Sequence, residues 1–153
     1  MYLLDSIGHY GPIIVFAITV YNILYMKYYL WIFLLLTLIN YKINEILKLY
    51  ILEPRPKNQK NFIDNDALIG AHFYGMPSGH AQGISFSIIY LYLVKKSLPL
   101  LYLTLFIGFL TLYQRWKYNR HTVEQLGIGS MVGLSLGYIA YHLTNYMIHY
   151  YQS

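Results

Sequence analysis

The sequence has no cysteine among its 153 residues, and only 11% of them are charged. Without cysteine, the chain can form neither a disulfide framework nor a thiolate zinc site. Charged residues make up about a quarter of an ordinary soluble domain, so this low fraction argues against one. The 11 Lys and Arg residues are scattered rather than gathered in a basic tail. This distribution predicts an anionic substrate or lipid headgroup as partner, and no nucleic acid.

Apolar residues dominate what is present, at 57% of the chain. Extended at their edges, the uncharged runs approach the roughly 20 residues that a helix needs to cross a bilayer. We therefore predict an all-α, multi-pass transmembrane bundle of about five spans, folded as a single domain over residues 1–153. The uncharged runs are Tyr28–Tyr41, Ile84–Val94, Ser97–Gln114 and Leu126–Tyr141.

The expected helices alternate between short and long connections. The short ones, at 26–27 and 95–97, imply antiparallel hairpins on one side of the membrane. The long connection at 53–78 and the short link at 115–121 then lie together on the other side, where the polar residues gather. We expect residues 1–11 to form an interfacial segment before the first helix; the alternative is that this helix, which is short for a full span, begins earlier or is tilted. The predicted helices are Pro12–Tyr25, Tyr28–Leu52, Gly79–Lys95, Leu98–Gln114 and Thr122–Ile148.

The first polar cluster ends the second predicted helix, with Lys48 and then Arg55-Pro56. Residues seven apart share a face if the helix continues, so the two cations would converge near its end. Arg offers a planar fork to a phosphate and Lys offers a point charge. The alternative is that both side chains reach for lipid headgroups.

The second cluster, Pro77-Ser78-Gly79-His80, lies where the long loop becomes the third helix. Ser78 is a good N-cap, and Gly79 lets a ligand approach the backbone. The free N–H groups of a first helical turn form an anion site, beside which His80 would project. Capping alone explains Ser78, but it does not explain the whole string, so we favour a functional interpretation.

The third cluster supplies Arg115 and His121 just before the last helix. Two histidines flanking one phosphate can divide the roles of nucleophile and proton donor near neutral pH. The remaining histidines stand alone in the sequence, so we interpret them as packed or headgroup-facing residues. They are His9, His72, His142 and His149.

The three clusters, in this order and spacing, resemble the motifs of the type 2 phosphatidic acid phosphatase superfamily. Its pattern is K-x-x-x-x-x-x-R-P, then P-S-G-H, then S-R-x-x-x-x-x-H-x-x-x-D, and here it spans the motif core 48–125. The sequences Glu53-Pro54-Arg55-Pro56 and Tyr74-Gly75-Met76-Pro77-Ser78, and His121-Thr122 with Gln125, are most similar to the dolichyl diphosphatase branch.

This resemblance implies a mechanism without metal or cofactor. His121 would attack phosphorus to form a phosphohistidine, and His80 would protonate the departing oxygen and later activate water. The equatorial oxygens of the phosphate would be held by Lys48, Arg55, Arg115, Ser78 and the Gly79 amide.

Two positions depart from the superfamily pattern. Gln114 replaces the Ser that precedes the Arg, and Gln125 replaces the Asp that would orient the nucleophile. A Gln carbonyl can accept a hydrogen bond from the imidazole Nδ1–H but cannot stabilise a positive ring as a carboxylate would. Glu124 is the alternative partner of His121. We favour Gln125 because it lies one helical turn from His121.

The predicted activity is hydrolysis of an isoprenoid lipid diphosphate to the monophosphate and inorganic phosphate. Two alternatives stay open: a broad phosphatidate or lipid phosphate phosphatase, and an inactive membrane scaffold of the same fold. The resemblance also implies the endoplasmic reticulum membrane in a eukaryote, with the site facing the lumen or exterior. Basic residues are nearly balanced across the two faces and do not decide the orientation. The sequence does not predict an oligomeric state.

Overall fold

Five α-helices form the described part of the chain in a computed structural model, which covers residues 2–60, 62 and 70–152. These residues contain no strand, only an isolated bridge between Pro54 and Tyr74. The all-α prediction is therefore confirmed. The elements are α1 (Tyr2–Ile23), α2 (Lys27–Ile51), the short 3₁₀ turn η1 (Gly70–Phe73), α3 (Gly79–Lys95), α4 (Leu98–Lys117) and α5 (Val123–Gln152).

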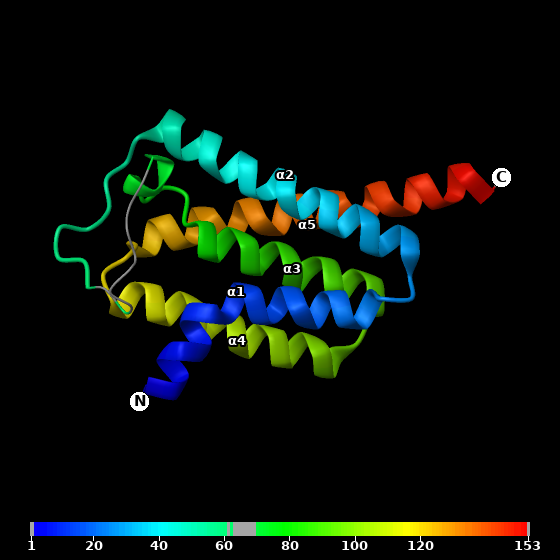
Figure 1. Cartoon of the computed structure of the whole chain (residues 1–153), viewed down its shortest axis with the longest axis horizontal. Coiled ribbons are helices and arrows are strands. Elements are labelled where there is room, and N and C mark those ends of the chain that lie inside the picture. Colours follow the sequence, from blue (N-terminus) through cyan, green and yellow to red (C-terminus); the bar gives the residue numbers. More distant parts are fainter. Residues whose placement is uncertain (1, 61, 63–69, 153) are drawn as a thin grey trace.

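Four of the described helices, α1, α2, α4 and α5, are long and apolar enough to cross a membrane. The fifth, α3, has 17 residues and packs against all four others at the centre of the bundle (Figure 1). Large apolar side chains such as Trp31, Leu38, Phe109 and Met131 point outward. Apolar residues outside and polar residues inside suit lipid rather than water as the solvent. The protein is a multi-pass membrane bundle.

The two ends of the bundle differ as the connection lengths predict. Tight turns join α1 to α2 and α3 to α4 at one end (Figure 1). At the other end, α2 and α4 finish and α3 and α5 begin. All three polar clusters therefore lie at this second end.

The predicted start of the first helix is wrong. The helix begins at Tyr2 rather than Pro12, so no separate interfacial segment precedes it. Tertiary packing explains the difference: Gly8 lets α1 lie directly on α4, where an added Cβ would be 2.7 Å from the Gln114 Cβ. Asp5 also forms an ion pair with Lys117 of α4, at 2.8 Å. These contacts hold the first turns in helical form against α4.

Glycines on α5 bring it into close contact with α3, because small residues let two helix backbones approach each other. A Cβ on Gly129 would lie 2.6 Å from the Ser78 carbonyl oxygen, and one on Gly137 would lie 2.6 Å from that of Phe86. The Ser78 amide donates to the carbonyl of Gln125 at 3.0 Å. The starts of α3 and α5, which carry the second and third clusters, are thus held together.

Candidate functional site

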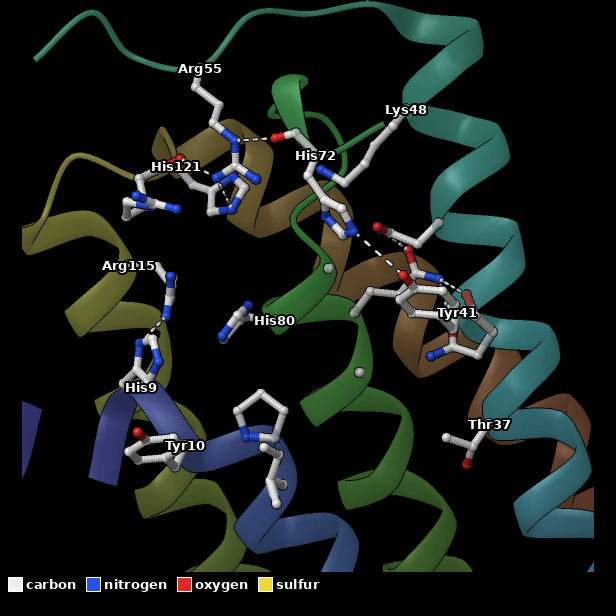
Figure 2. Close-up of a pocket in the computed structure, with 18 residues that line it drawn as sticks. His9, Tyr10, Thr37, Tyr41, Lys48, Arg55, His72, His80, Arg115 and His121 are labelled. Atoms are coloured by element: carbon white, nitrogen blue, oxygen red, sulfur yellow. Dashed lines mark hydrogen bonds between the residues drawn. The ribbon is translucent and has the colours of Figure 1, made fainter. Parts of the chain in front are cut away.

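A cavity of about 560 Å³ opens at the polar end of the bundle (Figure 2). Its size is within the usual range for a small-molecule site. Ser78 and Gln125 do not line it, because Ser78 caps α3 by accepting from the Ala81 amide and Gln125 lies behind His121. The other residues predicted for the site all line the cavity: Lys48, Arg55, Gly79, His80, Arg115 and His121.

Backbone carbonyls hold the first two cations in place. Lys48 is 1% exposed, and its Nζ donates to the Tyr74 carbonyl at 2.8 Å. Arg55 donates from Nε to the His72 carbonyl at 2.9 Å and from an Nη to the Arg120 carbonyl at 3.1 Å. Carbonyl contacts fix these side chains without cancelling their charge. Both cations are therefore positioned to attract an anion.

His121 is almost fully buried, at 3% exposure, and both of its ring nitrogens have contacts. Nε2 lies 3.2 Å from an Nη of Arg55, and Nδ1 lies 3.2 Å from Oε1 of Gln125. Burial lowers the pKa of His121 well below 6.5, and the positive charges of Arg55 and Lys48 lower it further. The ring is consequently neutral at pH 7, the form that a nucleophile requires.

The structure distinguishes the two candidate partners of His121. Gln125 is fully buried and faces the His121 ring, whereas Glu124 is exposed on the outer side of α5. Its position beside Nδ1 gives Gln125 the contact that the one-turn spacing suggested. Its effect on catalysis stays a prediction.

The opposite wall of the cavity contains His80, Arg115 and a residue that the sequence did not point to. His9 of α1 places its Nδ1 2.6 Å from an Nη of Arg115, and its ring centroid lies 6.1 Å from that of His80 (Figure 2). The interpretation of His9 as a packed or headgroup-facing residue is wrong, because His9 lines the cavity. Nothing in the sequence links the first helix to the motifs, so only packing of α1 on α4 reveals this contact.

Two further residues of the wall were missed. Arg120 is 5% exposed and lines the cavity, as does His72, whose ring nitrogen is 3.4 Å from the Tyr41 hydroxyl. Arg120 directly precedes His121 in the sequence, and this adjacency was a usable signal. His72 had none, because its position depends on the turn η1 folding back over α2.

A network of side-chain amides joins α2 to α3 in the wall of the cavity. The side chain of Gln82 donates to the carbonyl of Asn40 at 2.9 Å and accepts from Asn44 at 2.8 Å. Buried amides that are paired in this way rigidify the wall they form. Among residues 2–60, 62 and 70–152, no group of three His, Asp or Glu is arranged to hold a metal ion.

The fold and motifs define a class of protein. The chain belongs to the PAP2 superfamily, whose family profile matches residues 29–148. This match confirms the resemblance drawn from the three motifs. The matched region begins after α1, so His9 lies outside it.

A curated relative indicates the branch. Dolichyldiphosphatase 1 of Dictyostelium discoideum is 34% identical over 116 residues, which are 68% of this chain and 47% of the relative. The chain thus spans about half the length of the relative, and it is similar to the dolichyl diphosphatase branch, as the motifs indicated. No significant match was found among solved structures.

Proposed function

We propose that the protein is a lipid phosphatase that hydrolyses an isoprenoid lipid diphosphate to the monophosphate and inorganic phosphate. The observation that carries this proposal is the cavity in which two histidines and the motif cations meet. Such an arrangement suits phosphoryl transfer, in which positioning and electrostatic stabilisation supply most of the catalysis. The name of the Dictyostelium relative supports the diphosphate as substrate.

In the first step, the lone pair on Nε2 of His121 attacks the terminal phosphorus. The bond from phosphorus to the bridging oxygen breaks, and His80 donates a proton to that oxygen as it leaves. In the second step, His80 takes a proton from water, and the water oxygen attacks phosphorus. The P–N bond then breaks, which releases inorganic phosphate and restores His121.

The charge of the cavity favours a diphosphate. Four cationic side chains line it, since Arg120 adds to Lys48, Arg55 and Arg115, and no Asp or Glu of the described residues is among its lining. A lipid diphosphate carries more negative charge than a phosphate monoester, so four cations match it better. These cations would neutralise the phosphoryl oxygens, and we therefore propose a reaction that needs no metal.

The lower part of the cavity gives a route for the lipid chain. Ile13 of α1 and Thr37 and Tyr41 of α2 line it, and these two helices make few contacts with one another. An isoprenoid chain can therefore extend between α1 and α2 toward the surrounding lipid while the diphosphate stays among the cations.

The test is phosphate release by purified protein in detergent with EDTA, from an isoprenyl diphosphate and from phosphatidate. Wild type should act faster on the diphosphate, and His121→Ala should lose at least about 10³-fold in rate. His149→Ala, which removes an exposed imidazole at the far end of α5, should behave as wild type. With ³²P in the terminal phosphate, an alkaline quench should leave label on wild type and none on His121→Ala.

Three results would overturn this proposal in different ways. Faster release from phosphatidate would favour the broad lipid phosphate phosphatase. Equally low release by wild type and His121→Ala from every lipid phosphate would favour the inactive scaffold. Activity that EDTA abolishes and a divalent metal restores would disprove the metal-free reaction.

A further inference from the structure

The side chain of Gln125 lies between the proposed nucleophile and a carboxylate. Its Oε1 is 3.2 Å from Nδ1 of His121, while its Nε2 is 2.7 Å from a carboxylate oxygen of Glu53. The same Nε2 is 3.0 Å from the Pro54 carbonyl. A chain of hydrogen bonds therefore runs from the imidazole through an amide to Glu53.

The partners of this amide decide which way it faces. A carboxylate and a backbone carbonyl can only accept, so the NH₂ group of Gln125 must point toward Glu53 and Pro54. Its oxygen is then left facing His121. Gly75 closes over the amide, and a Cβ there would lie 2.6 Å from the Gln125 Cδ. Little space remains for another rotamer.

The direction of the amide fixes the tautomer of His121. An oxygen opposite Nδ1 requires a proton on Nδ1, which leaves the lone pair of the neutral ring on Nε2. The contact on the other side of the ring supports the same tautomer. The Nη of Arg55 lies 3.2 Å from Nε2 and can only donate, so Nε2 must accept. Two independent contacts thus assign the lone pair to the nitrogen beside the cations.

We propose that Glu53 is a positioning residue for His121 and acts through Gln125. The carboxylate that the motif pattern lacks at position 125 is present one amide further away. It polarises and orients the amide, which stabilises the positive charge that forms on the ring when Nε2 bonds to phosphorus. This inference rests on the proposed function for its catalytic consequence but not for the tautomer.

The local fold does not depend on the Glu53 side chain. The Glu53 carbonyl accepts from the Gly75 amide at 2.7 Å, and the bridge between Pro54 and Tyr74 follows directly. These are backbone contacts that a side-chain substitution leaves in place. Glu53→Gln keeps the shape of the side chain, removes its charge, and allows the two amides to flip together.

Steady-state kinetics on an isoprenyl diphosphate measure the effect. Glu53→Gln should lower kcat about 10-fold with KM unchanged, and Glu53→Leu should lower it about 100-fold, as for other outer partners of functional histidines. Glu124→Gln is the matched control, since this exposed carboxylate is one residue from Gln125. It should leave both constants unchanged.

A charge swap separates positioning from structure. Gln125→Glu alone places two carboxylates together and should be poorly active. Combined with Glu53→Gln, it puts a carboxylate directly on Nδ1–H with an amide behind it, and activity should exceed that of Gln125→Glu alone by about 10-fold. If the double variant loses as much activity as the losses of Gln125→Glu and Glu53→Gln combined, the proposal is wrong.

The tautomer is measured without substrate by ¹⁵N NMR of the imidazole nitrogens, with His121 assigned by its absence in His121→Ala. Wild type should carry its proton on Nδ1, and Glu53→Leu should weaken the Nδ1–H hydrogen bond to Gln125 and shift the Nδ1 resonance, while Arg55 still keeps the lone pair on Nε2. A proton on Nε2 in wild type, or no change in Glu53→Leu, would overturn the positioning role even if the enzyme is active. If the wild type shows the expected tautomer but hydrolyses no lipid phosphate, that result would instead count against the proposed function.

Discussion

The two histidines of the cavity are held in different ways. His121 is buried, and both ring nitrogens have partners, Gln125 on one side and Arg55 on the other. His80 lies in the first turn of α3, is partly exposed, and its ring has no hydrogen-bond partner among the described residues. A nucleophile benefits from one fixed tautomer, whereas a group that gives and takes a proton must change state. The difference in their contacts is consistent with the two roles proposed for them, nucleophile for His121 and proton donor and acceptor for His80.

Removing the less constrained histidine is expected to have the largest effect of the predictions that follow. His80→Asn should lower kcat by about 10²–10⁴-fold on a lipid diphosphate, because the departing oxygen loses its proton donor. On phosphatidate, whose departing alkoxide is far more basic than a departing phosphate, the loss should be larger. His121→Asn should be inactive on both substrates. If His80→Asn loses the same factor in kcat on both substrates, the proposed distinction between the roles of His80 and His121 is wrong.

The pH dependence tests the more constrained histidine. In the proposed mechanism His121 must be neutral to attack, and burial with nearby cations lowers its pKa well below 6.5. The acidic limb of kcat/KM should therefore lie below pH 6.5 and fall about 10-fold per unit there. Arg55→Gln removes a positive neighbour, so the limb should move to higher pH, by up to about 1 unit. A limb that stays in place would mean that another group sets it.

The same group affects folding stability. In the unfolded chain His121 regains its ordinary pKa near 6.5, so acid protonates the unfolded state first. The contribution of neutral His121 to the free energy of unfolding is therefore fully present above about pH 6.5. It is lost as the pH falls toward the lower folded-state pKa. Thermal unfolding in detergent should show a smaller drop of Tm with acid for His121→Asn than for wild type.

The contribution of α1 gives the smallest effect. His9→Gln replaces the ring 2.6 Å from Arg115 with a more flexible acceptor, and kcat/KM should fall about 5-fold, or about 1 kcal/mol. His142→Gln, an exposed histidine of α5, serves as the control. If His9→Gln and His142→Gln behave alike, the contact of His9 with Arg115 contributes nothing to catalysis, and α1 only covers the cavity.

Much of the fold could be predicted from local patterns. Apolar run length gave the spans, and the Ser78 cap with Gly79 placed the start of α3 correctly. The start of α1 could not be fixed from the sequence, since residues 1–11 suggested an interfacial segment while the contact of Gly8 with α4 extends the helix back to Tyr2. That contact joins segments far apart in sequence, and no local signal reports it.

The sequence by itself determined the membrane class, the helical order and the three motifs, because hydrophobic length and residue spacing are local properties. Only the tertiary structure decided which neighbours complete the cavity. His9 arrives from a helix outside the matched family region, and Glu53 reaches His121 through the side chain of Gln125. Side-chain direction and hydrogen-bond partners depend on how the helices pack, which residue spacing alone does not specify.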